Sequence, residues 1–380
     1  MEKHSRKKIL IIGEMFSDNL GDGIICEIVQ NTLNDFNTEI LDLSGRIEFN
    51  NQNDFSSSFS ILTEYQKYIK EKLKKILKIL NIKVITKKID FIYKNFKNLF
   101  DNKVNKPDII LFAGGQLLMG CFLKPIEYII NYAEKNSIPV FFNACGLGKL
   151  DGINEKKEIQ RILNSKNVLF ISVRDGSDKI SSLGITNPIL ITHDTAILCS
   201  KYKKIKQKHK NKIGIGIMIS HDICVNRQIK FWSKIINKIN NNNENWEVFC
   251  NGSTEDYEFA KYILNKLNYS IEKHLCKRPV YPDELINIIG SYKKIISMRL
   301  HSLIIAYSYN VPAIAISWDK KVSAFYEKVG NADLCFSFSD SINKIINCFE
   351  NMKFKNADKN KIEQTITTNI RRMINKINEN

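Results

Sequence analysis

Short apolar runs, each followed by a polar or glycine-containing loop and an amphipathic segment, recur along the first half of the chain. The first such unit predicts a strand over residues 9–13, a loop over residues 19–23 and a helix over residues 24–33. Later strands of the same kind are expected at these ranges: 107–113, 139–148 and 168–175. Strands that alternate with helices in this way are typical of a parallel sheet covered by helices on both faces.

A second series of the same kind begins after a lysine-rich break. Residues 201–212 contain seven lysines, which predicts an exposed connection between two domains. Beyond it, strands are expected at 213–219, 246–250, 294–298 and 311–317, and helices at 229–239, 257–267 and 283–291. We predict two doubly wound Rossmann-like domains, over residues 1–200 and 213–350, which face each other across a cleft at the carboxyl ends of their strands.

Residues 351–380 are predicted to form a C-terminal helix. The apolar residues of this segment fall at helical spacing, at Ile362, Ile366, Ile370, Met373 and Ile377. Two arrangements are compatible with this pattern. The helix can cross back to the first domain and restrict the opening of the cleft, or it can pack on the second domain.

Length and composition agree with a two-domain globular protein. A chain of 380 residues exceeds the size at which one hydrophobic core usually stops growing, and 43% of the residues are hydrophobic. No stretch is long and apolar enough to predict a membrane span, and the N-terminal residues show no cleavage site of a secretion signal. We therefore expect a cytoplasmic protein. Nine cysteines are scattered without a Cys-x-x-Cys pair, which favours reduced thiols and predicts no structural metal.

The net charge of +17 suggests an anionic partner, such as a phosphate-bearing substrate, a nucleic acid or a membrane surface. The chain is also rich in Lys, Asn and Ile, a composition that an AT-rich genome produces in all of its proteins. The distribution of the charge is therefore more informative than its total.

A basic insertion is predicted over about residues 60–103. Within it, residues 66–103 carry twelve lysines and three acidic residues. Its apolar residues at helical spacing are Ile69, Leu73, Ile76, Leu77 and Leu80, the pattern of an amphipathic helix. This helix can make peripheral contact with a membrane, or it can pack on its own domain with its lysines in solvent. Nucleic acid is not expected as a partner, since no recognition motif accompanies the charge.

The strongest candidate for chemistry lies where the strand over residues 294–298 ends. Arg299 and His301 follow this strand directly, and the apolar residues 303–307 predict a helix after them. Backbone N–H groups at a helix start attract anions, and a guanidinium can hold a carboxylate or phosphate through two parallel hydrogen bonds. Histidine can transfer protons near neutral pH. The alternative is an ordinary junction with a surface arginine and a histidine that caps the turn.

Several short motifs occur in order along the chain. They are Asn19-Leu20-Gly21-Asp22, Gly114-Gly115, Asn143-Ala144-Cys145-Gly146-Leu147-Gly148, Ser172-Val173-Arg174-Asp175, His193-Asp194-Thr195-Ala196, Arg299-Leu300-His301-Ser302 and Val311-Pro312 followed by Trp318-Asp319-Lys320-Lys321. In this order and spacing the chain resembles the polysaccharide pyruvyltransferase family, from about residue 9 to residue 330. The last two motifs are the most specific, although Trp318 stands where a tyrosine is expected.

The resemblance implies a pyruvyltransferase with a fold similar to that of B-type glycosyltransferases. Such an enzyme transfers pyruvate from phosphoenolpyruvate, its co-substrate, to a sugar residue of a surface polysaccharide or its precursor, and forms a ketal across two hydroxyls. It needs no nucleotide sugar, and no cofactor or metal is expected. The acceptor would be a glycan or a lipid-linked sugar, which suggests a place at the cytoplasmic face of the membrane.

The resemblance, with the chemistry of the reaction, also suggests roles for single residues. Phosphoenolpyruvate carries a phosphate and a carboxylate, and we expect Arg174, Arg299 and Lys321 to hold them. His301 is expected to act as general acid or base, and Asp22 to accept a proton from the sugar hydroxyl or else to cap a helix. The other substrate-binding candidates are Asn19, Gly21, Gly114, Gly115, Asp194 and Trp318.

Several of these candidates also have a structural alternative. Arg174 could be a salt-bridged surface residue, Asp194 a helix cap and Trp318 a filler of the core. The glycines could serve only as turn residues.

Two other functions remain open. A nucleotide-sugar-dependent glycosyltransferase would use the same two-domain architecture. Such an enzyme usually has a carboxylate pair that binds the donor ribose, and Glu327 has no obvious partner of this kind in the sequence. The other alternative is a non-catalytic scaffold that binds glycans or membranes. The presence of Arg299 and His301 favours an enzyme.

Overall fold

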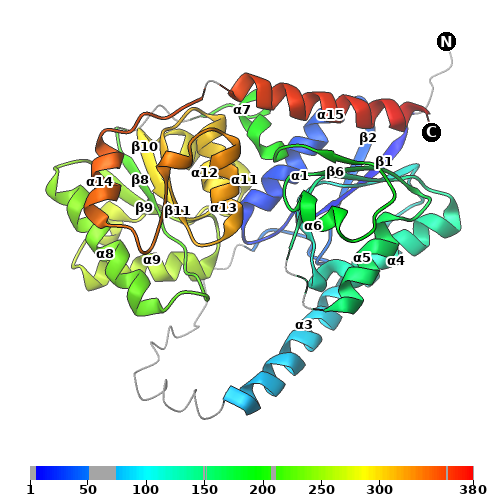
Figure 1. The fold of residues 1–380 in the computed structure, drawn as a ribbon, viewed down its shortest axis with the longest axis horizontal. Helices are drawn as coiled ribbons and strands as arrows, with labels where there is room; N and C mark the ends of the chain where they lie inside the picture. The colour runs from blue at the N-terminus through cyan, green and yellow to red at the C-terminus, as the bar shows by residue number, and fades with distance from the viewer. Residues whose placement is uncertain are drawn as a thin grey trace.

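Two parallel β-sheets with helices on both faces make up the described part of the chain (Figure 1). The computed structural model describes residues 6–50, 74–148, 150, 152–206, 211–356 and 358–379, without the side chains of residues 74–88. This architecture confirms the predicted fold of two doubly wound Rossmann-like domains.

The first sheet has seven strands in the order β2-β1-β3-β5-β6-β7, with β4 paired to β5 beside this path, and every pair is parallel. Its strands are β1 (Lys8–Gly13), β2 (Asn37–Asp42), β3 (Ile109–Phe112), β4 (Gly115–Leu118), β5 (Val140–Leu147), β6 (Val168–Val173) and β7 (Ile189–Ile191). Its helices are α1 (Leu20–Thr32), α3 (Lys74–Lys103), α4 (Gly120–Asn136), α5 (Ile153–Leu163), α6 (Ser177–Ser181), the 3-10 helix η1 (Thr195–Leu198) and α7 (Cys199–Tyr202). The central strand β3 is buried along its whole length because helices cover both faces, which explains its continuous apolar run.

The second sheet has five parallel strands in the order β12-β11-β10-β8-β9. Its strands are β8 (Ile213–Gly216), β9 (Trp246–Phe249), β10 (Lys294–Ser297), β11 (Ala313–Ser317) and β12 (Cys335–Ser337). Its helices are α8 (Val225–Asn241), α9 (Thr254–Lys266), α10 (Ile271–His274), α11 (Pro282–Gly290), α12 (Leu300–Ser308), α13 (Lys320–Lys328), the 3-10 helix η2 (Ala332–Leu334), α14 (Ile342–Glu350) and α15 (Lys359–Glu379). The predicted connection between the domains begins within α7, and its residues 207–210 lie outside the described part.

In both sheets the strand order reverses beside the first strand of the domain, between β1 and β3 and between β8 and β10. Loops that leave neighbouring strands in opposite directions open a crevice at the carboxyl ends, where proteins of this class bind ligands. Most of the predicted site residues lie in the loops after β1, β3, β10 and β11 or at the start of the element that follows each loop. The topology therefore brings these residues to one edge of each sheet.

A shared hydrophobic core joins the two domains. α1 and η1 of the first domain pack against α11 and α12 of the second. One buried cluster contains Ile24 and Ile197 together with Leu285 and Leu303. The hydroxyl of Ser308 also donates a hydrogen bond to the carbonyl of Ile197 (2.8 Å). The two domains are thus in close contact next to the crevice.

Helix α15 extends from the second domain over the first, along the upper side of the molecule in Figure 1. The side chain of Asn369 donates a hydrogen bond to the carbonyl of Ile191 (3.4 Å), and the ammonium of Lys376 donates one to the carbonyl of Leu169 (3.1 Å). Its apolar face, with Ile370, is buried in the shared core. Of the two arrangements that the sequence allowed, the helix adopts the one that spans both domains, and it begins later than predicted.

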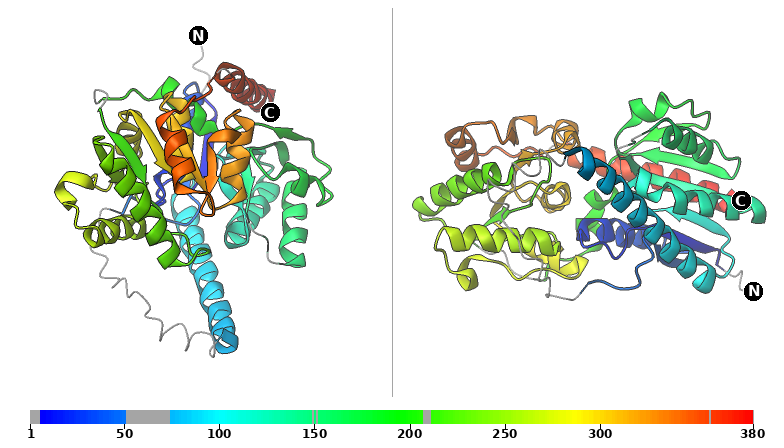
Figure 2. Two further views of the ribbon diagram at one scale, coloured as in Figure 1. Left: turned by 60° about the vertical axis from the view of Figure 1, so that its left-hand side comes forward. Right: turned by 90° about the horizontal axis from the view of Figure 1, so that it is seen from below.

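The basic segment can be compared with its prediction only in part. Helix α3 projects from the first domain in Figure 1 and in the left view of Figure 2, and Phe96 and Phe100 near its end are buried where α3 packs on α4. The positions predicted to form an apolar stripe, from residue 69 to residue 80, lie outside the described residues or the described side chains. Contact of this stripe with a membrane therefore stays a prediction.

The segment that the sequence predicted as a glycine loop is helical. α1 begins at Leu20, so Gly21 and Asp22 lie in its first turn with Asn19 at the N-cap position. Glycine usually weakens a helix, which favoured a loop. At Gly21, however, a neighbour from the second domain lies too close for a side chain. The prediction of a loop over residues 19–23 is wrong for this reason.

Candidate active site

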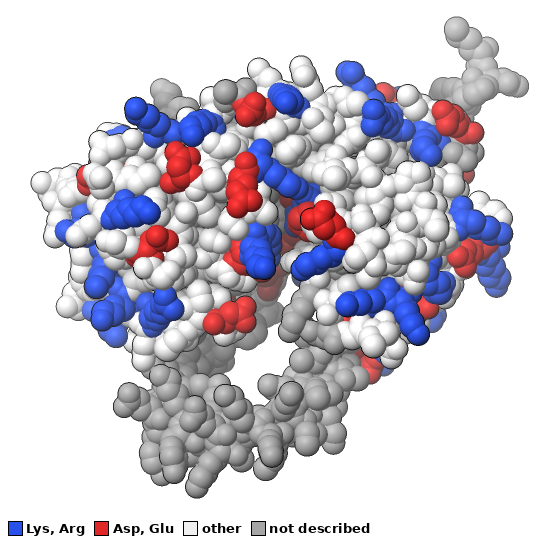
Figure 3. All heavy atoms as spheres, viewed as in Figure 1, with Lys and Arg blue, Asp and Glu red and all other residues white. Residues whose placement is uncertain are grey.

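A small cavity lies between the two domains, and side chains of both domains line it. Its volume is about 120 Å³. The first domain contributes Glu14, Asn19, Asp22, Gln116, Met119 and Arg174, and the second contributes Arg299, Leu300, His301, Trp318 and Lys321. Figure 3 shows acidic and basic side chains gathered along the line where the domains meet on the face in view. The cavity combines cations, carboxylates and one histidine.

His301 lies in the first turn of α12, within the interface between the domains. Only 5% of its surface is exposed. Its Nε2 atom lies 3.8 Å from Oδ2 of Asp194 and has no hydrogen-bond partner among the described residues. Burial lowers the pKa of His301, although the carboxylates of Asp22 and Asp194 oppose this shift. The imidazole is therefore neutral near pH 7, with a buried nitrogen available to a ligand.

Arg299 follows β10 at the N-cap position of α12. Its Nε and Nη2 atoms contact Oδ2 of Asp256 at 2.8 and 2.6 Å. Asp256 is buried in the first turn of α9, and its other carboxylate oxygen accepts a hydrogen bond from the backbone N–H of Ile219 (3.1 Å). Burial raises the pKa of Asp256, and Arg299 opposes this shift. A buried carboxylate thus fixes the guanidinium, which keeps 23% of its side chain exposed at the cavity.

Arg174 follows β6, and only 6% of its side chain is exposed. Its guanidinium pairs with the carboxylates of Asp194 and Asp175. Burial acts to lower the pKa of Arg174, but the carboxylates of Asp194, Asp175 and Asp22 together raise it, so the side chain keeps its charge. Its carbonyl oxygen accepts a hydrogen bond from the ammonium of Lys328 in the second domain. Arg174 is a buried cation of the domain interface and not a surface residue.

Lys321 lies in the first turn of α13, after the carboxyl end of β11. Its ammonium lies 4.8 Å from the centre of the Trp318 ring and donates a hydrogen bond to Oε1 of Gln116 from the first domain (3.3 Å). The indole N–H of Trp318 donates to the carbonyl of Met298 (3.1 Å), which fixes the ring. Burial lowers the pKa of Lys321, against the opposing charge of Asp319. Trp318 therefore positions a partly desolvated cation through a cation–π contact.

Carboxylates also line the cavity. Oδ2 of Asp22 accepts a hydrogen bond from the amide of Asn19 (2.9 Å), and Oδ1 of Asn19 is buried without a hydrogen-bond partner among the described residues. Glu14 pairs with Arg46 at 2.8 Å. Burial and the nearby charge of Asp22 raise the pKa of Glu14 to about 7, with Arg46 opposing. A carboxyl group with this pKa can donate or accept a proton near neutral pH.

The predicted glycines shape the cavity through the space that they leave. Gly114 and Gly115 have φ angles of 96° and 80°, in the left-handed region that favours glycine. A β-carbon on Gly115 would lie 3.4 Å from Oδ1 of Asp22, and one on Gly114 would lie 2.9 Å from the carbonyl oxygen of Asn143. These two glycines and Gly21 do not line the cavity.

Asp194 also lies beside the cavity and not in its lining. Its Oδ1 atom accepts a hydrogen bond from the backbone N–H of Ala196 (2.9 Å), and Asp194 is the N-cap residue of η1. Its Oδ2 atom contacts Arg174. Asp194 therefore has two structural contacts. It caps η1, which was one of the alternatives that the sequence allowed, and it pairs with Arg174, a cation that lines the cavity.

The polar residues Glu14, Gln116 and Asp256 were not predicted as members of the site. Glu14 follows β1 directly, so the rule that selected Arg299 at the end of a strand would also have found it. Gln116 lies beside two predicted glycines. No local sequence pattern indicates Asp256 as a site residue, because it lies 43 residues before Arg299, the residue with which it pairs.

The described residues contain no group of three or more histidine, cysteine, aspartate or glutamate side chains that could hold a metal ion. The nine cysteines form no disulfide in the structure. Among the helices of the described residues, none combines the length and the apolar character that are needed to cross a membrane.

Solved structures with the same fold include enzymes of nucleotide-sugar metabolism. The UDP-GlcNAc 2-epimerase of Methanocaldococcus jannaschii is 12% identical, with a TM-score of 0.56 over 97% of this chain and 99% of that chain. A putative UDP-N-acetylglucosamine 2-epimerase of Listeria monocytogenes is 10% identical, with a TM-score of 0.56 over 95% and 91%. The Neisseria meningitidis UDP-GlcNAc 2-epimerase bound to UDP-GlcNAc is 15% identical, with a TM-score of 0.54 over 98% and 100%. At these identities the likeness shows the fold, which is that of the B-type glycosyltransferases.

No match is found among curated protein sequences. The family model for polysaccharide pyruvyl transferase, in contrast, matches residues 19–320. This match contains the motifs that carried the resemblance from Asn19 to Lys320, and it covers most of the two domains. The chain therefore belongs to the polysaccharide pyruvyl transferase family.

Proposed function

We propose that this protein transfers pyruvate from phosphoenolpyruvate onto two hydroxyls of one sugar residue in a surface polysaccharide or its precursor, and so forms a cyclic ketal. One observation carries the proposal beyond family membership. Three cations, Arg174, Arg299 and Lys321, line the same cavity as a buried histidine with an unpaired nitrogen. This combination suits a small trianion that must be protonated while it reacts.

The cations have different partners, which suggests different tasks. Arg174 and Arg299 are each held by buried carboxylates, so their guanidinium groups cannot turn freely toward solvent. The ammonium of Lys321 contacts an amide and an aromatic ring, and no carboxylate of the described residues lies within 4.0 Å of it. We assign Lys321 to the phosphate, which would pair with an ammonium that has no carboxylate partner of its own. We assign the two arginines to the overall anionic charge of the donor.

The reaction requires a balanced transfer of protons. One proton adds to the methylene carbon of phosphoenolpyruvate and makes it a methyl group. A sugar hydroxyl then bonds to the adjacent carbon as the C–O bond to phosphate breaks, and a second hydroxyl of the same sugar closes the ketal. The two hydroxyls release two protons, one of which replaces the proton given to the methylene, while the other leaves with hydrogen phosphate. Groups that can both donate and accept protons are therefore required.

His301, Asp22 and Glu14 are our candidates for these transfers. The neutral imidazole of His301 can accept a proton from a hydroxyl through Nε2 and return it to the phosphate. Asp22, with one oxygen held by Asn19, can accept the proton of the other hydroxyl. Glu14 has a pKa of about 7 and is partly protonated at neutral pH, so it can supply the proton for the methylene carbon.

The size of the cavity suggests that the domains open to admit the acceptor. A volume of about 120 Å³ is well below the roughly 300 Å³ at which typical ligand pockets begin. A sugar residue and phosphoenolpyruvate together would need more room. We infer that the structure represents a closed arrangement of the domains, which would exclude water from the reacting donor.

The test is acceptor-dependent release of phosphate from phosphoenolpyruvate by the purified protein, with a panel of soluble and lipid-linked glycans. His301→Gln should bind phosphoenolpyruvate, seen as thermal protection, but release phosphate at a rate reduced about 100-fold or more. Lys320→Gln changes a neighbouring exposed lysine outside the cavity and should behave as the wild type. Phosphate release without any acceptor, or equal activity of His301→Gln, would contradict the proposal.

The second candidate is a nucleotide-sugar-dependent glycosyltransferase, because several structures with this fold are enzymes of nucleotide sugars. The same thermal measurement separates the two. Protection by UDP-GlcNAc but not by phosphoenolpyruvate would favour the glycosyltransferase. Protection by phosphoenolpyruvate that is lost in Arg174→Gln and Lys321→Gln would favour pyruvyl transfer.

A further inference from the structure

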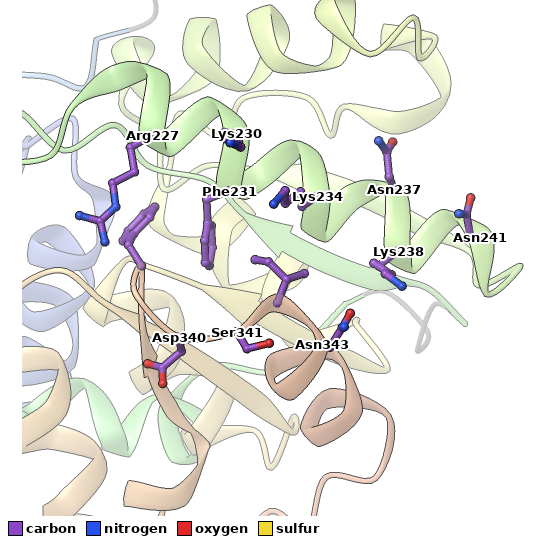
Figure 4. A pocket seen from close by; sticks show the side chains of 12 residues that line it. Arg227, Lys230, Phe231, Lys234, Asn237, Lys238, Asn241, Asp340, Ser341 and Asn343 are labelled. Carbon is purple, nitrogen blue, oxygen red and sulfur yellow. The ribbon is translucent and has the colours of Figure 1, made fainter.

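A large groove lies on the second domain, away from the candidate active site. It runs between α8 and the segment that leads into α14, and its volume is about 630 Å³ (Figure 4). Arg227, Lys230, Lys234 and Lys238 of α8 form one wall. The groove thus has an elongated, basic wall, unlike the compact cavity between the domains.

No acidic side chain among the described residues pairs with the cations of this wall. α8 contains no aspartate or glutamate from Val225 to Asn241. Across the described chain, no carboxylate is recorded within 4.0 Å of the four cations, which are all exposed. Asp340, an acidic residue on the opposite side, accepts hydrogen bonds from the backbone N–H and the hydroxyl of Ser337 (2.7 and 2.9 Å).

The charge of Arg227 opposes the stability of α8 itself. The first turn of a helix favours acidic side chains, because its N–H groups carry a partial positive charge. α8 has Arg227 near its first turn and no acidic residue there. The start of α14, at Ile342, lies in the same groove and adds a second partial positive charge. An arrangement that concentrates positive charge without internal compensation favours an anionic ligand.

The spacing of the lysines indicates an extended ligand. Lys230, Lys234 and Lys238 repeat every four residues, so successive positions lie about 6 Å apart along the helix axis. Figure 4 shows these side chains along one side of the groove, with Arg227 at one end and Asn241 at the other. A chain that carries negative charges at intervals can contact several of them at once.

The floor of the groove adds an apolar surface. The rings of Phe231 and Phe338 lie 4.5 Å apart between their centres, tilted by 46°. Both line the groove, and Phe338 is only half-buried. Aromatic rings beside cations and amides suit the C–H faces and acidic groups of sugars. The concave shape favours a chain that lies within it over the flat surface of a membrane.

The groove also begins at the edge of the sheet that holds the candidate active site. α8 starts after β8, and α14 starts after β12, so the Arg227 end lies at the carboxyl edge of the second sheet. We propose that this groove binds a segment of an anionic polysaccharide, so that the growing polymer lies along α8 while one of its sugars occupies the cavity between the domains. The identity of the ligand as the acceptor polymer rests on the proposed function, whereas binding of an acidic glycan does not.

The test uses hexagalacturonate, which carries a carboxylate on each sugar, with neutral maltohexaose as the uncharged control. The variant K230Q/K234Q/K238Q removes the lysine wall. The matched control, K156Q/K157Q/K166Q, removes the same charge from exposed lysines of the first domain. Binding is measured by calorimetry on the full chain, and the melting temperatures of the variants are compared with that of the wild type.

We expect the wild type and the matched control to bind hexagalacturonate equally and maltohexaose weakly or not at all. The groove variant should bind hexagalacturonate at least tenfold more weakly with an unchanged melting temperature. An equal loss in both triple variants would show that only net charge matters and would overturn the proposal. Sedimentation with phosphatidylglycerol vesicles that depends on the three lysines, without binding of hexagalacturonate, would overturn it in favour of a membrane contact.

Phosphate release from phosphoenolpyruvate separates this inference from the proposed function. With a short soluble acceptor, the groove variant should keep the wild-type rate, because its lysines do not line the cavity. A protein that binds hexagalacturonate through the groove but releases no phosphate would leave the groove assignment intact and contradict pyruvyl transfer. A protein that releases phosphate but does not bind hexagalacturonate would support pyruvyl transfer and contradict the groove assignment.

Discussion

Gly21 of the first domain lies directly against the imidazole of His301 from the second. A β-carbon on Gly21 would lie 2.1 Å from Cγ and 2.3 Å from Cβ of His301. Since these atoms are close to the backbone of α12, His301 cannot turn away without a shift of the helix. The contact therefore couples the position of the candidate proton-transfer group to the fit between the domains.

This contact makes Gly21→Ala a sensitive test of the site. Alanine favours a helix by about 1 kcal/mol over glycine, so the local effect on α1 should be stabilising. We nevertheless expect acceptor-dependent phosphate release to fall about 100-fold, because the added methyl displaces His301 or separates the domains by a fraction of an ångström or more. Gly152→Ala is the control, since a β-carbon there meets no atom closer than 4.0 Å. Full activity of Gly21→Ala would show that the interface is loose.

The pKa of Glu14 predicts a dependence of stability on pH. Its ordinary value of 4.5 is raised to about 7 in the folded protein. The unfolded chain therefore loses the proton of Glu14 first, and the free energy of unfolding should fall as the pH rises from about 4.5 to about 7, by up to roughly 3 kcal/mol. Glu14→Gln should remove this contribution. Urea unfolding at pH 5 and pH 8 should show a smaller decrease in the variant, and an identical decrease would contradict the assignment.

The pair of Arg174 and Asp194 should contribute to stability mainly through the cost of breaking it. Asp194→Asn leaves the buried guanidinium with Asp175 as its remaining carboxylate partner, and we expect a loss of about 3 kcal/mol in the free energy of unfolding. The double variant Arg174→Met, Asp194→Leu should recover much of this loss, since no charge then stays buried. The double variant should release no phosphate, since it lacks the guanidinium of Arg174. Denaturant unfolding combined with the phosphate assay checks both parts, and recovery of activity would exclude Arg174 from donor binding.

Lys321 should affect binding of phosphoenolpyruvate more than the rate of the reaction. A hydrogen bond to a charged group is worth about 1.5–3 kcal/mol, so Lys321→Gln should raise the KM for phosphoenolpyruvate roughly 10- to 100-fold. Lys320→Gln removes the same charge one residue earlier, on an exposed position, and should leave KM unchanged. If both variants raise KM equally, long-range attraction by the charged surface explains the effect, and Lys321 has no direct contact with the donor.

Local patterns in the sequence were sufficient for the fold class and for the Arg299 and His301 junction. Both depend on an apolar strand that ends where a helix begins, and this is visible within a few residues. The strand β2 was not predicted, because four of its six residues are half-buried or exposed. Apolar periodicity is weak in such edge strands.

The remaining features of the site depend on contacts between distant parts of the chain. The pairing of Arg299 with Asp256 and the contact of Gly21 with His301 arise only when helices from different units pack together. A glycine that excludes a side chain from an interface has the same sequence signal as a glycine that makes a turn. This is why residues 19–23 were predicted as a loop although α1 begins at Leu20.

The path of α15 has a consequence for the order in which the protein folds during its synthesis. Domains generally fold as the ribosome releases them, the N-terminal one first. Yet Leu169 on β6 receives its hydrogen bond from Lys376, which is synthesised 207 residues later. Until α15 arrives, the part of the first domain beneath it has no cover from this helix. In a newly made first domain, apolar surface therefore stays accessible to chaperones until the second domain and then α15 have been synthesised.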